Sequence, residues 1–159
     1  MKQSVLVRSA ISCGGGALDY LERLMMKKAV VVADRRTEFA RNAVEKIEDI
    51  LREKGIEYII KDDIEKKPKI TELIDDVALI TSINADTIIA VGDDTTINIA
   101  KLVLLLYEYP GMSFSEIEKE NDKGAIKLQT RFVVIASNSG MAEEISRLGT
   151  IMIDDTDLI

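Results

Sequence analysis

The sequence contains no histidine among its 159 residues. Histidine is the usual general base near neutral pH and the commonest transition-metal ligand in proteins. Its absence excludes a catalytic triad built on imidazole, and it excludes imidazole-bound zinc or iron within this chain alone. We therefore expect no metal site formed by the chain itself.

Cysteine is almost as scarce, because Cys13 stands alone. A single cysteine excludes a disulfide within the chain and suits a reducing compartment. Long hydrophobic runs are also missing: the first apolar run is interrupted by Arg8, and no stretch approaches the roughly 20 apolar residues that cross a bilayer. We expect a cytoplasmic protein with no membrane partner.

Positive charge is in deficit as well. The chain has 21 Lys and Arg against 28 Asp and Glu, a formal net charge of -7, so it repels a nucleic-acid backbone on average. No nucleic-acid partner is expected. With 47% apolar residues the chain can bury one core, and it is too short for two full domains. Residues 1–159 are therefore expected to form a single domain.

Six short apolar runs, several rich in β-branched residues and bounded by turn formers, predict buried strands. They cover residues 5–11, 29–33, 58–60, 87–91, 132–136 and 151–153. Helical patterns lie between them. The clearest has its apolar residues on one face at the 3.6-residue period: Ala40, Ala43, Val44, Ile47, Ile50 and Leu51.

Further helical patterns are predicted at residues 17–26, at 96–107 and within 113–127. Another has an apolar face of Ile70, Leu73, Ile74, Val77 and Ala78. Alternation of strands and helices predicts the α/β class: a doubly wound, mostly parallel sheet with helices on both faces, of the Rossmann-like kind. Ligands of such folds bind beyond the carboxyl ends of the strands, and four turns qualify.

The first turn contains Gly14, Gly15 and Gly16. Three glycines allow the backbone to approach a phosphate and present N–H groups to it. The same residues suit a tight strand-to-helix turn without a ligand. Taken by itself, this stretch of sequence slightly favours such a turn over a phosphate site. Cys13 beside them is interpreted as a packed residue rather than as a nucleophile.

The second turn begins with Asp34, directly after the predicted strand 29–33. An acidic residue there can accept hydrogen bonds from an adenosine ribose, and it can equally act as a helix N-cap. Arg35 and Arg36 follow. They could meet a 2′-phosphate, although solvated side chains beside a helix start are the interpretation that we prefer.

The third turn contains Gly92, Asp93, Asp94, Thr95 and Thr96. Its position between a strand and a helix is that of an anion site. However, two carboxylates already satisfy the helix N-terminus and would repel a pyrophosphate. Capping by these acids is the preferred interpretation, and a divalent-cation site is a lesser alternative.

The fourth turn contains Ser137, Asn138 and Gly140, after the predicted strand 132–136. Its hydroxyl and amide groups could bind a ligand. Capping by Ser137 or Asn138, with acidic residues in the first turn, explains the pattern almost as well.

Taken together, these turns resemble the N-terminal domain of the iron-containing alcohol dehydrogenase family, in its wider group with dehydroquinate synthase. The most specific stretch is Ala-Asp at 85–86, the strand to Gly92, and Ile-Asn-Ile-Ala-Lys at 97–101. The family has Ala-Asp, an apolar strand, Gly-Gly-Gly-Ser and Ile-Asp-x-Ala-Lys. Asp93 and Asp94 replace two of the glycines that cradle the pyrophosphate.

The resemblance implies an NAD or NADP ligand, with Asp34 on the ribose. It also implies a second, helical domain that supplies the iron ligands and that would follow the last residue of this chain. We therefore predict an NAD(P)-binding-type domain that is not a complete oxidoreductase by itself, paired as a dimer or with a relative that carries the catalytic domain. The alternative is a degenerate, non-catalytic homologue that acts as an interaction or regulatory module.

Overall fold

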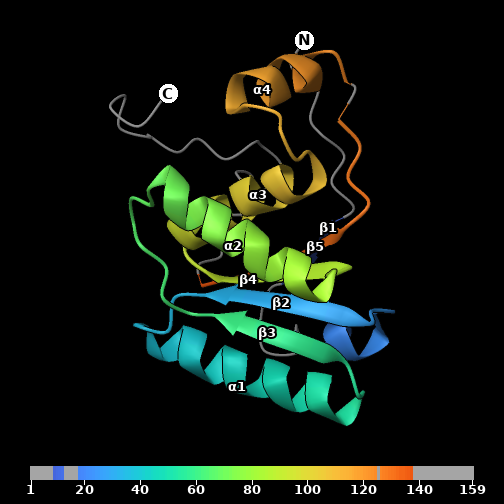
Figure 1. The fold of residues 1–159 in the computed structure, drawn as a ribbon. Helices are drawn as coiled ribbons and strands as arrows, with labels where there is room; N and C mark the ends of the chain where they lie inside the picture. Colours follow the sequence, from blue (N-terminus) through green and yellow to red (C-terminus); the bar gives the residue numbers. More distant parts are fainter. Residues whose placement is uncertain (1–8, 13–17, 125, 138–159) are drawn as a thin grey trace.

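The computed structural model describes residues 9–12, 18–124 and 126–137. Their centre is a five-stranded sheet in which every neighbouring pair of strands is parallel. The spatial order is β1-β5-β4-β2-β3 (Figure 1). The strands are β1 (Ser9–Ser12), β2 (Lys28–Ala33), β3 (Glu57–Lys61), β4 (Thr87–Gly92) and β5 (Arg131–Ala136).

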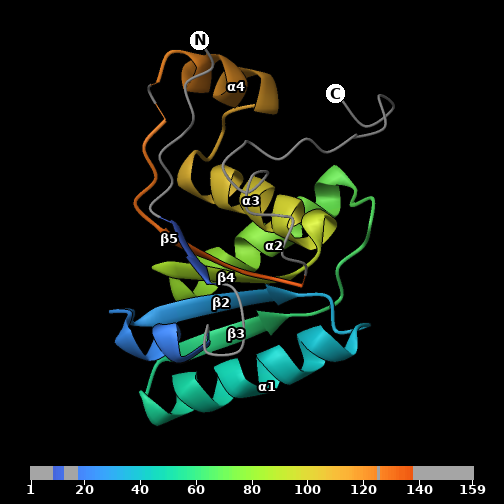
Figure 2. The same cartoon turned by 180° about the vertical axis from the view of Figure 1, so that it is seen from behind.

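Helices cover both faces of this sheet, as Figures 1 and 2 show: α1 lies on one face, and α2 and α3 lie on the other. The helical elements are η1 (Leu18–Arg23), α1 (Glu38–Glu53), α2 (Ile70–Ile83), α3 (Asp94–Glu108) and α4 (Phe114–Asp122). The predicted α/β, Rossmann-like class is therefore confirmed. The predicted strand 151–153 and residues 5–8 of the first strand lie outside the described residues.

The core consists of two layers because successive residues of a strand point to opposite faces of the sheet. On β4, Ile88 and Ala90 pack among the side chains of α2 and α3. Their neighbours Ile89 and Val91 pack with α1 on the other face. Every residue of β4 is buried, which explains why this strand reads as a continuous apolar run rather than as an alternating one.

Helix α1 forms where its sequence predicts it. All six residues of the predicted inner face are buried. The Thr37 hydroxyl accepts a hydrogen bond from the Ala40 N–H at 3.2 Å, which satisfies one of the N–H groups left free at a helix start. Gly55, with φ of +65°, follows the helix end in the left-handed conformation that glycine adopts without steric cost.

Helix α2 is placed correctly by the pattern, but the predicted inner face is partly wrong. Ile74 is 56% exposed and Ala78 is exposed as well, whereas Asp76 is buried. The reason is an ion pair: the Lys61 ammonium lies 3.0 Å from the Asp76 carboxylate and 2.8 Å from Asp63. A pattern of apolar residues cannot reveal a buried acid whose partner lies on another element.

The predicted helix at 17–26 is also wrong in extent and type. The structure has only the 3₁₀ segment η1, in which Leu21 is the buried residue. Met25, which a longer helix would carry, is 86% exposed. Leu21 is buried in the layer that contains α1, and Leu18 and Leu24 are partly buried beside it. Short runs of this kind are typical of 3₁₀ helices.

The Lys61–Asp76 pair gives a first test. Burial raises the pKa of the Asp76 carboxyl, and the hydrogen bond from Lys61 opposes this. Lys61→Met leaves that carboxylate without its partner, so its folded-state pKa rises further. Because Lys61 is partly exposed, we expect a loss of about 2 kcal/mol in the free energy of unfolding at pH 7, less than for a fully buried pair.

The sign of the pH dependence follows from linkage. A carboxyl whose folded pKa is raised stabilises the fold most at low pH and loses this contribution as the pH rises. The difference between the variant and the parent should therefore shrink from pH 7 to pH 4 in urea denaturation. Lys28→Met, which removes an exposed pair with Glu57, is the control. A difference that is unchanged on acidification would contradict the assignment.

Candidate functional site at the carboxyl edge of the sheet

Three of the predicted turns meet at the carboxyl edge of the sheet. Ala33 of β2 is in register with Val91 of β4, and Gly92 at the end of β4 is in register with Ala136 of β5. The backbone N–H of Ser137 donates to the Gly92 carbonyl at 3.0 Å. The turns after β2, β4 and β5 are thus neighbours along a single edge.

The helices that follow β2 and β4 leave this edge toward opposite faces of the sheet, as Figure 2 shows. After β2 the chain enters α1 on one face of the sheet, and after β4 it enters α3 on the other face. Neighbouring strands whose helices leave toward opposite faces open a crevice between their first turns, and this is where doubly wound folds bind ligands. In this chain that switch point lies between β2 and β4, beside Asp34 and Gly92, and we refer to it as the crevice.

Gly92 has a structural requirement of its own. Its φ is +144°, and a Cβ atom there would approach the Thr96 Oγ1 to 3.1 Å. Any other residue at this position would strain the backbone and crowd the first turn of α3. Gly92 is the glycine of this turn that the chain shares with the family motif, and the fold gives a geometric reason for glycine at this position.

Asp93 is the N-cap of α3. Its Oδ1 accepts hydrogen bonds from the Thr96 N–H and from the Thr96 hydroxyl, both at 3.0 Å, so the preferred interpretation of capping is confirmed. Asp94 is exposed in the first turn, and Thr95 is half-buried. The divalent-cation alternative joins Asp93 and Asp94 to Glu143, which lies outside the described residues, so it stays a prediction.

Asp34 does not cap a helix, because Thr37 has that role. Instead its carboxylate accepts hydrogen bonds from the Arg36 backbone N–H at 3.0 Å, from Nε at 2.7 Å and from Nη2 at 2.6 Å. The hydrogen bonds from the Arg36 side chain lower the pKa of Asp34, although partial burial opposes this. Asp34 is therefore a fixed anion that already has a partner.

The two arginines after Asp34 have different surroundings, and neither is simply solvated as the sequence suggested. Arg35 lies between two carboxylates, 3.4 Å from Glu48 and 3.3 Å from Asp62. The Arg36 guanidinium holds Asp34, and its Nη2 also lies 3.4 Å from the Ile64 carbonyl.

Sequence reasoning overlooked the segment after β3. It lies beside the crevice, because the Ile64 carbonyl contacts Arg36 and the Lys66 charge helps to lower the pKa of Asp34. The available signal was a charged run, residues 61–67, placed directly after a predicted strand. It was missed because β3 is the edge strand and its apolar run is short.

Five of the predicted site residues cannot be placed. Gly14, Gly15, Gly16, Asn138 and Gly140 lie outside the described residues, as does the neighbouring Cys13. Their roles stay predictions. The strand ends that precede them are described: Ser12 of β1 is in register with Ile135 of β5, so the ends of these two strands lie side by side.

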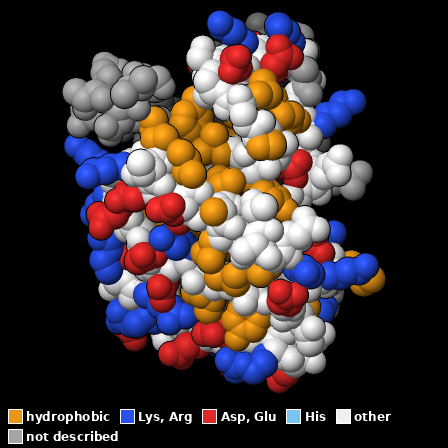
Figure 3. Space-filling model, in the orientation of Figure 1, with side chains coloured by type: hydrophobic (Ala, Val, Ile, Leu, Met, Phe, Trp, Pro, Cys, Tyr) orange, Lys and Arg blue, Asp and Glu red, His pale blue; other side chains and the backbone are white. Residues whose placement is uncertain are grey.

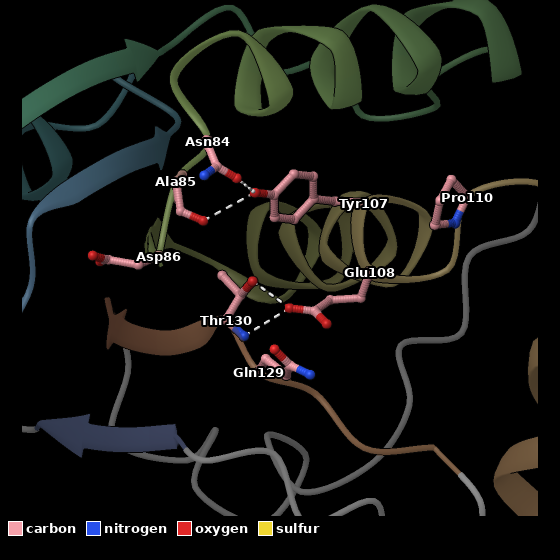
Figure 4. Close-up of a pocket in the computed structure, with 8 residues that line it drawn as sticks. All are labelled: Asn84, Ala85, Asp86, Tyr107, Glu108, Pro110, Gln129 and Thr130. Atoms are coloured by element: carbon pink, nitrogen blue, oxygen red, sulfur yellow. Dashed lines mark hydrogen bonds between the residues drawn. The ribbon is translucent and has the colours of Figure 1, made fainter.

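A hollow of about 510 Å³ lies at the opposite, amino edge of the sheet (Figure 4). The Tyr107 hydroxyl donates there to the Ala85 carbonyl at 3.1 Å and lies 3.3 Å from the Asn84 side chain. Glu108 accepts from both the N–H and the hydroxyl of Thr130. These polar groups bond to one another, so they tie the ends of α2 and α3 to the strands and do not converge on an empty centre.

A comparison with protein families matches residues 9–158 to the model described as iron-containing alcohol dehydrogenase. The chain belongs to the iron-containing alcohol dehydrogenase family. Among the curated relatives, the NADPH-dependent butanol dehydrogenase of Clostridium saccharobutylicum is 29% identical over 138 residues, which cover 87% of this chain and 36% of that protein. The aldehyde-alcohol dehydrogenase 2 of Entamoeba histolytica is 25% identical and is covered to 17%.

Solved structures of the family share the fold. A 1,3-propanediol oxidoreductase superposes with a TM-score of 0.71 at 23% identity, covering 99% of this chain and 41% of that chain. The iron-containing alcohol dehydrogenase of Thermococcus thioreducens gives 0.69 at 21% identity, covering 84% and 36%. The chain thus spans about a third or less of the length of these curated relatives. None of the helices within its described parts is long and apolar enough to cross a membrane.

The cap of α3 gives a second test. Asp93→Ala removes the acceptor for the Thr96 N–H, and loss of such a cap costs about 1 kcal/mol in the free energy of unfolding. Asp93→Asn keeps an acceptor and should cost much less. Asp94→Ala removes the same charge without removing that bond, so it is the matched control. Equal losses for Asp93→Ala and Asp94→Ala in urea denaturation would show that charge matters here rather than the cap.

Proposed function

We propose that this chain is an NAD(P)-binding domain of the iron-containing alcohol dehydrogenase family, and that it does not complete hydride transfer with its own residues. The observation that supports the proposal is the arrangement at the carboxyl edge, where the ends of β2, β4 and β5 adjoin and the helices after β2 and β4 leave toward opposite faces. Folds of this class bind dinucleotides at such a point.

The residues around the crevice suggest how a dinucleotide would lie. The adenosine end would meet Asp34 and Arg36 after β2. The pyrophosphate would lie beside Gly92 and the first turn of α3, which contains Thr95 and Thr96. Ser137 would contact it from β5, together with the turn of Gly14, Gly15 and Gly16 and with Asn138 and Gly140.

Some of the residues along this path favour a dinucleotide, and others oppose it. Glycine at position 92 lets the backbone come close to a ligand. The next two residues, Asp93 and Asp94, are exposed carboxylates, and Asp93 already occupies the Thr96 N–H. A pyrophosphate must therefore bind next to two negative charges, so we propose that the affinity is lower than a glycine-rich turn would give.

The chemistry of such a complex would belong to the cofactor, whose nicotinamide carries the hydride. The residues of this chain would bind and orient it. The sequence has no histidine, and the described residues form no group that could hold a metal ion. We therefore assign no step to iron.

The second candidate function is an interaction or regulatory module that has lost the cofactor. Two observations favour it. Asp93 takes up an N–H group of α3 that an anion would use. Figure 3 shows hydrophobic side chains gathered over the face formed by α2, α3 and α4, and Ile74 on α2 is 56% exposed. A second copy of the chain, or a relative with the remaining length of these enzymes, would be the partner.

The broader expectations from the sequence are kept as parts of the proposal. We propose that residues 1–159 form one folding unit, that the protein works in the cytoplasm, and that it is a dimer or associates with a longer relative. Sedimentation velocity of the purified chain checks the dimer, and a monomer at micromolar concentration would count against it.

Isothermal titration calorimetry with NADP, NAD and ADP-ribose tests cofactor binding directly. We expect measurable binding, and we expect Asp93→Asn/Asp94→Asn to tighten it by roughly tenfold, about 1.4 kcal/mol, because two repelling charges are removed while the cap acceptor remains.

The matched control for that variant is Glu45→Gln/Glu118→Gln, which removes two charges at exposed positions of α1 and α4. Tightening by the control as well would indicate a net-charge effect rather than contact at the crevice. If neither the parent nor the asparagine variant binds any of the ligands and the chain is a defined oligomer, the interaction module replaces the cofactor domain as the function.

A further inference from the structure

The end of β2 presents a cation to solvent, although the residue that ends the strand is an acid. The side chain of Asp34 is 12% exposed, whereas that of Arg36 is 59% exposed. The guanidinium reaches back over the carboxylate and pairs with it through Nε and Nη2. A ligand that approaches this end of the crevice therefore meets Arg36 first.

The hydrogen bonds leave Asp34 little capacity for a ribose. An ionised carboxylate has about four acceptor positions, and three donors of Arg36 already use the carboxylate of Asp34. A ribose with two free hydroxyls would have to displace a charge-assisted pair, which is stronger than the neutral hydrogen bonds that would replace it. Arg36, by contrast, keeps N–H donors that do not contact Asp34.

Arg36 and Arg35 differ in the charged groups that surround them. The guanidinium of Arg35 is held between Glu48 and Asp62, which already satisfy its charge. The hydrogen bond to Asp34 raises the pKa of Arg36, and the charges of Glu65 and Asp93 raise it further. These acids keep Arg36 charged and oppose an incoming anion, while Lys66 lies close enough to act on Asp34 and favours the anion.

We propose that Arg36 selects a dinucleotide with a 2′-phosphate on its adenosine ribose, so that NADP is preferred over NAD. This inference rests on the proposed function, because it concerns the adenosine end of the same crevice. In folds of this class an acidic residue after the strand favours a free 2′-hydroxyl, and a nearby arginine accommodates a 2′-phosphate. Here both residues are present, and their pairing buries the acid beneath the arginine.

Two pairs of ligands test the selection by calorimetry on the 159-residue chain. NADP and NAD differ by the 2′-phosphate alone. Adenosine 2′,5′-bisphosphate and 5′-AMP differ in the same way. They carry only one of the two phosphates of the pyrophosphate and no nicotinamide, so they depend less on the acidic turn before α3. We expect the phosphorylated member of each pair to bind at least about tenfold more tightly, as one charge-assisted contact would give.

Arg36→Ala should abolish this preference, because it removes the cation and frees Asp34. Arg35→Ala is the matched control, with the same loss of charge one residue away, and it should leave the ratio of the two affinities unchanged. Asp34→Asn provides a second variant in which the arginine is kept. It should retain the preference for the 2′-phosphate.

The outcomes separate this inference from the proposed function. Equal binding of NADP and NAD, or an unchanged ratio in Arg36→Ala, overturns the selection by Arg36 and leaves a dinucleotide-binding domain. An equal effect of Arg35→Ala overturns it too, since general charge would then explain the result. Absence of binding for every ligand of both pairs overturns the selection and the proposed function together.

Discussion

Pairing of β4 with both of its neighbours is the constraint on which the other features of this domain depend. The strand is buried throughout, and it is bonded to β2 on one side and to β5 on the other. These two ladders bring the ends of three strands to one edge. Because α1 and α3 then leave toward opposite faces, the same pairing that closes the core also creates the switch point between β2 and β4.

The chemistry of that crevice depends on which polar groups the fold has already satisfied. Asp93 is bonded to the first turn of α3, and Asp34 is bonded to Arg36. In both cases an acid at a proposed ligand-binding position has an internal partner. The exposed groups are the carboxylates of Asp93 and Asp94 after β4 and the guanidinium of Arg36 after β2, so the two ends of the proposed site differ in charge.

Much of this fold could be predicted because its elements follow simple periodicities. The inner face of α1 follows from six apolar residues at helical spacing, all of which are buried. The face of α2 could not be predicted in the same way, because Asp76 is buried through its ion pair with Lys61. Such a pair joins residues that are distant in sequence. Helix propensity likewise could not show that residues 18–23 would form only the short 3₁₀ segment η1.

The candidate site shows the same division between local and nonlocal causes. Capping by Asp93 was predicted because the residue type and its place before a helix determine that role. The role of Asp34 remained open in the sequence, since a ribose acceptor and a helix cap need the same side chain. Its actual partner is the arginine two residues later. The contribution of residues 62–66 could not be predicted from the sequence, because it depends on the position of β3 in the sheet.

Amide chemical-shift mapping by NMR tests the central claim, that the carboxyl edge around β4 is the ligand site. The ¹⁵N-labelled chain would be titrated with ADP-ribose. The account predicts that shifts concentrate at Arg36, Gly92, Thr95 and Ser137 and that they spare Asp86 and Thr130 at the amino edge. Shifts concentrated at the amino edge, or no shifts at saturating concentrations of ligand, would contradict it.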